Sequence, residues 1–206
     1  MRSVSLATQQ ALTEARDKGL APRQLLWITV KDRTTGAPGS FGFWSGDYPV
    51  DIPVISGTTG LQVTRTYTGD VNLSIGNIPR VSDLSMVQVE ITMSAIPTIT
   101  QQIVRGYEAR LAKVEIHSLQ LSPATRQPVA AAEIEFLAEV DSAPIETGAA
   151  GGESLIKFSV VSDAISMLTR TNPRRRSDEA QQLRGGDRIN RYSNAISTWK
   201  IAWGQD

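Results

Sequence analysis

Cysteine is absent from this chain of 206 residues, and histidine occurs only once, at His117. Without cysteine the chain forms no disulfide, no thiolate zinc site, no cysteine-held iron–sulfur cluster and no cysteine nucleophile. With a single histidine it forms no multi-histidine metal site, and a Ser-His-Asp triad would have to use His117. The two absences therefore exclude several kinds of metal site and of nucleophilic catalysis.

Long apolar runs and an excess of one charge are also missing. No stretch of about 18 apolar residues occurs, so we expect no membrane span. The opening residues MRSVSLAT lack an apolar signal core, which predicts a soluble protein without a secretory signal. The 21 basic and 21 acidic side chains cancel, so net charge gives no reason to expect a nucleic-acid or anionic-membrane partner. At 40% hydrophobic residues, the chain has enough apolar material for a core.

Alternation of apolar and polar residues with a period of two dominates the chain, which is typical of half-buried β-strands. We predict a mainly β fold, an antiparallel sandwich or barrel with short helices. The strands are expected at residues 25–32, 41–44, 61–67, 72–78, 86–94, 112–122, 131–145 and 154–162. The pattern drifts in phase within 112–122 and suggests a bulge at Gly76. Residues 45–60 are expected to form a loop with a few extended residues.

Three segments have helical spacing of their apolar residues instead: 5–18, 99–111 and 163–170. The first is amphipathic, with Val4, Ala7, Ala11, Leu12 and Ala15 on one face. Pro173 ends the helical pattern of the segment that precedes it, 163–170. We therefore predict a β-rich domain over residues 1–172 and a C-terminal arm over 173–206 that ends in a strand.

Several residues invite a catalytic interpretation, and each has a simpler one. His117 is expected on the strand face opposite Val114 and Ile116, exposed to solvent or to a partner. The pairs Glu133/Glu135 and Glu139/Asp141 each share a strand face, at a spacing compatible with glycosidase carboxylates. A solvated outer sheet face explains them more simply. The segment ETGAAGGES (146–154) lacks the Lys-Ser/Thr ending of a phosphate-binding loop and is expected to connect a hairpin.

The arm is locally basic, and it ends in an alternation of Trp199, Ile201 and Trp203 that is typical of a strand. Acidic residues are mixed among its arginines and its aromatics are few. Arginine is also favoured at protein interfaces, because its planar guanidinium forms bidentate pairs. We therefore favour a protein contact over nucleic acid. The expected interface residues are Arg174, Arg175, Arg176, Arg184, Asp187, Arg188, Arg191, Trp199 and Trp203.

The sequence RRRSDEAQQLRGGDRINRYSNAISTWKIAWG (174–204) resembles the C-terminal motif of tail-tip proteins of long-tailed bacteriophages and gene transfer agents. That motif runs from arginines through an acidic and glutamine segment and a Gly-Asp-Arg turn to a final Trp-Gly. Upstream, LLWITV, FGFWSGDYPV, LSIGNIPRVSDLSMVQVEITMSAIP and VRGYEARLAKVEI are similar to family segments in the same order. Larger relatives hold an iron–sulfur cluster through cysteines, which this chain lacks.

The resemblance implies a structural virion protein with a tail-tube-type β domain, made in the host cytoplasm and assembled as a trimeric or hexameric ring. It also implies that the protein is not an enzyme and holds no metal or cofactor. Its implied partners are further copies of itself, tail-tube or distal-tail ring proteins, the central fibre or receptor-binding protein, and tape-measure protein or DNA in the lumen. A hub-type ring and a tube-terminating distal-tail ring both remain open. Two alternatives of another class are a cell-wall glycosidase and a carbohydrate-binding module that uses Trp44, Tyr48 and Tyr67.

Overall fold

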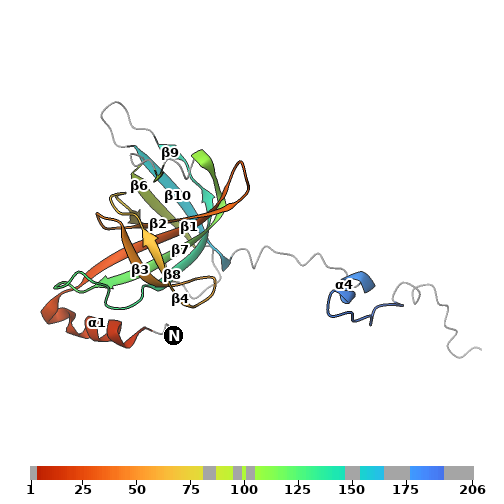
Figure 1. Cartoon of the computed structure of the whole chain (residues 1–206), viewed down its shortest axis with the longest axis horizontal. Helices are drawn as coiled ribbons and strands as arrows, with labels where there is room; N and C mark the ends of the chain where they lie inside the picture. Colours follow the sequence, from red (N-terminus) through yellow and green to blue (C-terminus); the bar gives the residue numbers. More distant parts are fainter. Residues whose placement is uncertain are drawn as a thin grey trace, which may run out of the picture. The chain divides into compact units, whose positions relative to one another are not determined.

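The structure, a computed structural model, describes residues 4–80, 87–94, 99–100, 105–146, 154–164 and 177–192 (Figure 1). The chain divides into two compact units, Met1–Met167 and Leu168–Asp206. We call the first unit the β domain. Its elements are α1 (Leu6–Lys18), β1 (Ala21–Asp32), β2 (Pro38–Trp44), β3 (Val50–Ile55), β4 (Gln62–Tyr67), β5 (Ser74–Ile75), β6 (Gln88–Ser94), β7 (Tyr107–Leu121), β8 (Glu133–Ser142), β9 (Ile145–Glu146) and β10 (Leu155–Ser162). The second unit contains α4 (Asp178–Gln182).

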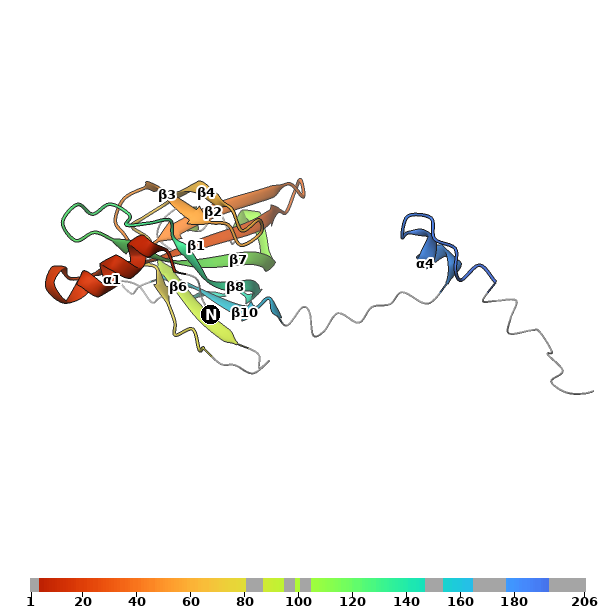
Figure 2. The same cartoon turned by 90° about the horizontal axis from the view of Figure 1, so that it is seen from below.

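One large antiparallel sheet forms the wall of the β domain. Its strand order is β2-β1-β7-β8-β10-β6-β5, and β9 pairs with β10. The sheet curls into a half-barrel, as Figures 1 and 2 show from two directions. The predicted fold class, mainly β and antiparallel with short helices, is therefore confirmed.

A second sheet, the hairpin of β3 and β4, is hydrogen-bonded to the large sheet on both of its sides. On one side, the Thr68 N–H donates to the Gly42 carbonyl of β2 at 2.8 Å. On the other side, the Ala132 N–H, just before β8, donates to the Pro53 carbonyl of β3 at 2.8 Å. Both junctions are parallel bridges. The hairpin is thereby held over one face of β1 and β7.

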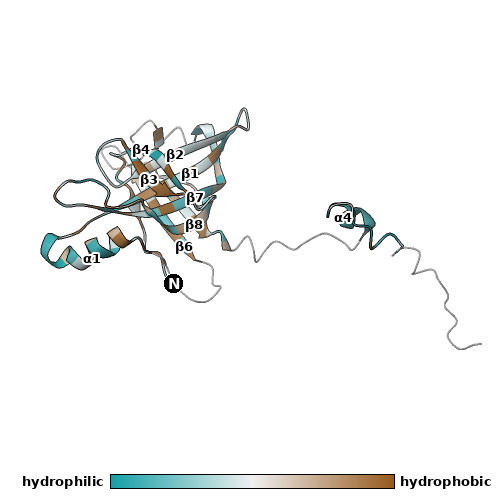
Figure 3. Cartoon of the chain, turned by 60° about the horizontal axis from the view of Figure 1, so that its bottom comes forward, coloured by the Kyte–Doolittle hydropathy of each residue, from teal (hydrophilic) through white to brown (hydrophobic). Residues whose placement is uncertain are grey.

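Strands β1 and β7 carry a core on each face, because the curled sheet closes over one face and the hairpin covers the other. Leu26, Ile28, Val114 and Ile116 belong to the larger core. The smaller core contains Leu25, Trp44, Ile52, Val54, Tyr67, Leu119, Leu121 and Ala132. Figure 3 shows the resulting hydrophobic colour along these strands. Burial on both faces erases the simple alternation, which explains the phase drift seen in the sequence of 112–122.

Two sequence predictions within the β domain are wrong in part. Residues 45–60 are not all loop, because Val50–Ile55 form β3 and pair with β4 along its length. The helix expected over 99–111 does not continue past Gly106, since β7 begins at Tyr107 and pairs with β1 there. Leu111 lies in that stretch with a positive φ of 60°, where the β1–β7 register shifts. This irregularity disturbs the period of two and leaves a spacing that resembles a helix.

Helix α1 confirms the helix predicted over 5–18. Ser5 caps the helix, with its side chain accepting a hydrogen bond from the Thr8 N–H, and Gly19 ends it at a φ of 77°. None of its residues is buried, and Leu6 and Leu12 are 71% and 49% exposed. The predicted helix over 163–170 lies outside the described residues from residue 165 onward.

The contact between the hairpin and β2 leaves no room for a methyl group at Gly42, so adding one should destabilise the protein. A Cβ added at Gly42 would lie 2.6 Å from the Thr66 carbonyl oxygen and 2.9 Å from the Trp27 ring. We expect Gly42→Ala to lower the free energy of unfolding by about 1–3 kcal/mol, through overpacking against backbone that has little room to shift. Urea denaturation of the purified protein measures this. Gly106→Ala is the matched control, since nothing lies within 4 Å of its added Cβ, and equal effects of the two changes would contradict the prediction.

Candidate functional site

A cluster of charged side chains is enclosed between the hairpin and β7. The Arg65 guanidinium of β4 donates to both carboxylate oxygens of Glu115 on β7, at 2.7 and 3.4 Å. The Gly57 N–H donates to the same carboxylate at 3.0 Å, and Arg65 also donates to the Ser56 hydroxyl at 3.2 Å. The guanidinium lies 4.6 Å from the centroid of the Trp27 ring. The Arg65 and Glu115 side chains are only 12% and 10% exposed.

His117 completes this cluster and is fully buried. Its Nε2 lies 2.9 Å from the Ile55 carbonyl oxygen of β3 and 3.5 Å from a Glu115 oxygen. Because a carbonyl can only accept, Nε2 carries the proton, and Nδ1 is left buried without a hydrogen-bond partner. The prediction of a solvent- or partner-facing histidine is wrong in its burial. His117 does lie on the face opposite Ile116, but the hairpin covers that face.

Burial and pairing act in opposite directions on the two titratable groups. Burial lowers the pKa of His117 below 6.5, although the Ile55 carbonyl and the Glu115 carboxylate oppose this. Burial raises the pKa of Glu115, but hydrogen bonds from Arg65 and Gly57 outweigh it, and the net pKa lies below its ordinary value. The cluster is therefore a neutral histidine beside a bound ion pair. Enclosed in this way, it is suited to joining the two sheets rather than to reaching a substrate.

Three of the four carboxylates proposed for glycosidase chemistry, Glu133, Glu135 and Glu139, have partners of their own. Glu135 pairs with Arg80 at 3.1 Å, and Glu133 accepts a hydrogen bond from the Ser5 N–H at 3.0 Å. Glu139 pairs with Lys113, whose ammonium also contacts Asp163. These contacts tie neighbouring segments of the β domain together.

The aromatic platform proposed for carbohydrate binding does not exist as such. Trp44 is 2% exposed and Tyr67 is 0% exposed, because both side chains fill the smaller core under the hairpin. Of the three proposed aromatics only Tyr48 is exposed. Stacking of a sugar requires ring faces that solvent can reach, so this trio cannot form that surface.

Four of the predicted interface residues lie in a short segment of the second unit, residues 177–192, which we call the C-terminal turn: Arg184, Asp187, Arg188 and Arg191. The other five, Arg174, Arg175, Arg176, Trp199 and Trp203, lie outside the described residues.

The C-terminal turn begins with α4, which is capped by Ser177: its hydroxyl accepts from the Ala180 N–H at 3.2 Å. The Asp178 carboxylate accepts from the Gln182 amide and from the Arg188 guanidinium, both at 2.7 Å. Hydrogen bonding by Arg188 holds the pKa of Asp178 below its ordinary value. Arg188, predicted to pair across an interface, thus has a partner ten residues away in its own segment.

The rest of the C-terminal turn reverses the chain after α4. Gly185 and Gly186 have φ values of 67° and 83°, a region that glycine adopts without strain. The Asp187 carboxylate then accepts from the Ile189 N–H at 3.1 Å and from the Gln181 side chain. The sequence LRGGDR is therefore a turn, as its glycines predict, and internal hydrogen bonds stabilise it.

Apolar side chains of the C-terminal turn lie on its surface. Leu183 is 72%, Ile189 79% and Tyr192 63% exposed. The Arg191 guanidinium lies 5.6 Å from the centroid of the Tyr192 ring. Neither Arg184 nor Arg191 forms an ion pair with any residue that the structure describes. A segment held by its own hydrogen bonds that leaves its larger apolar side chains exposed is suited to a protein contact.

Neither a protein-family model nor a curated protein matches the chain. In the described ranges no helix is long and apolar enough to cross a bilayer. The same ranges contain no group of three or more potential metal-ligating side chains.

Removing one member of the buried ion pair should be costly, because the other charge stays buried. We expect Glu115→Gln to lower the free energy of unfolding by about 3–5 kcal/mol, measured by urea denaturation. The double change Arg65→Met with Glu115→Leu should cost far less, since it leaves no unpaired charge. Lys113→Met, which breaks an exposed pair, serves as control and should cost under about 1 kcal/mol. A loss for Glu115→Gln no larger than this control would contradict the enclosed geometry.

Because the pKa of His117 is lowered, we expect the folded protein to become less stable in acid. A histidine with a pKa lowered by folding binds protons more readily when unfolded, so its stabilising contribution is complete above about pH 6.5 and is lost as the pH falls below it. We expect the free energy of unfolding to fall between pH 7 and pH 5, and to fall less in His117→Gln, which retains a donor for Ile55. His117 is the chain's only histidine, so the difference between the two slopes reports this one group. If the free energy of unfolding fell equally with pH in both proteins, the lowered pKa of His117 would be contradicted.

Proposed function

We propose that this chain is a structural component of a phage tail tip, a hub-type ring protein that joins the tail tube to the central fibre and host-recognition proteins. The observation that carries the proposal is the C-terminal turn, because it coincides with the motif by which the sequence resembles this family. Within it Asp178 accepts from Arg188 and Asp187 accepts from Gln181, and its larger apolar side chains remain exposed. A preformed apolar surface of this kind is suited to a neighbouring subunit.

The β domain supports the same proposal in a different way. A curled antiparallel sheet gives a stiff wall, and the hairpin with its buried ion pair braces that wall from one side. A ring that surrounds a lumen needs such a wall in every copy. In this proposal the chain acts by assembly and catalyses no reaction, and its place is the virion.

Partners follow from the same proposal. The chain would contact further copies of itself in a trimeric or hexameric ring, tail-tube or distal-tail ring proteins on one side, and the central fibre on the other. Tape-measure protein or DNA would occupy the lumen. A tube-terminating distal-tail ring is the alternative within this class, and ring symmetry distinguishes the two.

Light scattering on the purified full chain tests the proposal. We expect a discrete trimer or hexamer that becomes monomeric when Leu183 and Ile189 are both changed to Asp, because charged side chains disfavour burial at the contact. Truncation after Pro173 should have the same effect. Leu61→Asp is the matched control, since Leu61 is 68% exposed on the β domain, and it should leave the mass unchanged. A full chain that stays monomeric at all concentrations would count against a ring held by this segment.

A further inference from the structure

The tip of the β3–β4 hairpin, residues 55–57, contacts two titratable side chains of β7. The Ile55 carbonyl oxygen accepts from the His117 Nε2 at 2.9 Å. Two residues further on, the Gly57 N–H donates to the Glu115 carboxylate at 3.0 Å. The position of the tip therefore depends on groups whose charge can change with pH.

The base of the hairpin is held in a different way, by hydrogen bonds between backbone groups. Thr68, just after β4, donates to the Gly42 carbonyl at 2.8 Å and accepts from the Trp44 N–H at 3.1 Å. The Asp70 N–H donates to the Gly46 carbonyl at 2.9 Å, which joins the segments that enter and leave the hairpin. Backbone groups do not titrate, so a moderate change of pH acts on the tip and leaves the base attached.

Two charged side chains of the buried cluster act on the His117 ring. The Glu115 carboxylate, at 3.5 Å, favours a protonated ring, and the Arg65 guanidinium of β4 opposes it. Glu115 also accepts from Arg65 and Gly57, and its pKa lies below its ordinary value, so this carboxylate stays charged in mild acid. Burial raises the pKa of Tyr67 on β4 to about 12, so its hydroxyl stays neutral. His117 is therefore the member of the cluster that changes charge in mild acid.

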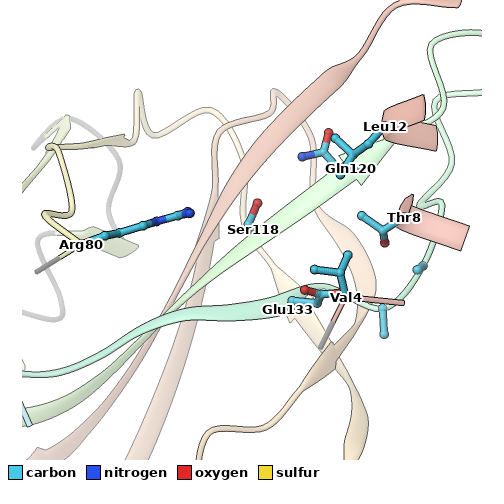
Figure 4. Close-up of a pocket in the computed structure, with 9 residues that line it drawn as sticks. Val4, Thr8, Leu12, Arg80, Ser118, Gln120 and Glu133 are labelled. Atoms are coloured by element: carbon cyan, nitrogen blue, oxygen red, sulfur yellow. The ribbon is translucent and has the colours of Figure 1, made fainter. Parts of the chain in front are cut away.

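The other strands next to β7 add no charge on this side of it. The residues of β1 and β8 that pair with His117 in register are both apolar: Leu25 and Ile134. The following residue, Ser118, lies on the opposite face of β7, because side chains alternate along a strand. Figure 4 shows Ser118 lining an open pocket beside α1 together with Glu133 and Arg80. Those two charged groups are thus across the strand from the His117 ring.

A proton on His117 would create two unfavourable conditions inside the closed cluster. It would bind at Nδ1, which is buried and has no hydrogen-bond partner among the described residues, so the new N–H donor would be unsatisfied. It would also add a positive charge to a cluster in which Arg65 and Glu115 already balance each other. Water that reaches the ring relieves both conditions, and for this the tip has to lift away from β7.

We propose that the hairpin tip is an acid-operated latch, in which protonation of His117 releases residues 55–57 from β7 while the base of the hairpin and the large sheet stay in place. Closing the tip lowers the pKa of His117, so the open form binds the proton more readily. Opening therefore increases as the pH falls below about 6.5, by up to about tenfold per pH unit for one proton. This local opening is distinct from loss of the whole fold, and it does not depend on the proposed function.

Hydrogen exchange of the full chain, followed by NMR at pH 7.5 and pH 5.5, tests the latch. The protection factor, the ratio of intrinsic to measured exchange rate, removes the direct effect of pH on exchange. We expect it to fall by up to about tenfold for the Ile55 and Gly57 amides, and the tip to be at least about tenfold less protected than β6 at both pH values. Equal protection of the tip and β6 would mean that the tip opens only when the whole domain unfolds, which overturns the proposal.

The variant His117→Gln separates the histidine from other effects of acid. Glutamine keeps a donor for the Ile55 carbonyl and does not titrate, so protection of the tip should change by less than about twofold between the two pH values. A fall as large as in the unmodified chain would show that another group drives the release, and the proposal would be wrong. Lys113→Met is the matched control on the same strand, because it removes an exposed pair with Glu139 and should keep the full response to pH.

A measurement on the unmodified chain covers the case in which His117→Gln does not fold. His117 is the chain's only histidine, so proton NMR of protein without a histidine tag follows the titration of this one ring. The ring should stay neutral until the pH is below about 6.5, the ordinary pKa of histidine. A titration midpoint at or above that value would show that the closed tip does not oppose protonation, and it would refute the latch.

Discussion

The β domain depends on the ion pair between Arg65 and Glu115, which is enclosed between two sheets. A charge taken from water is costly unless a partner and further hydrogen bonds replace the lost hydration. Here the carboxylate receives the guanidinium and the Gly57 N–H, and the guanidinium also lies over the Trp27 ring. These contacts are directional, so they fix the position of the hairpin in a way that apolar packing by itself does not.

The hairpin in turn determines what β1 and β7 must carry. With a core on each face, these two strands bury residues at successive positions, including Glu115, Ile116 and His117. Burial disfavours the charged form of His117 and keeps the ring neutral there, while its Nε2 donor is bound to the Ile55 carbonyl. The only histidine of the chain, an obvious candidate for chemistry in the sequence, serves in the structure as a buried connection between strands.

The C-terminal turn differs from the β domain, because hydrogen bonds rather than a core hold it together. Asp178 pairs with Arg188 and Asp187 with Gln181, and no residue of 177–192 is buried. Most globular units bury their larger apolar groups, whereas those of this segment are exposed. This arrangement is suited to a segment whose apolar surface is completed by another molecule, and α1, with its exposed leucines, has a similar character.

The sequence by itself determined the mainly β class, the positions of most strands, helix α1 with its Ser5 cap, and the glycine turn at 185–186, because periodicity, capping and positive φ are local properties. Only the tertiary structure decided that β3 is a strand, that β7 replaces a helix from Tyr107, and that Arg65 meets Glu115. These depend on pairing between segments about 50 residues apart, and local spacing carries no information about such partners. For the same reason Trp44 and Tyr67, which the sequence offers as surface aromatics, proved to be core.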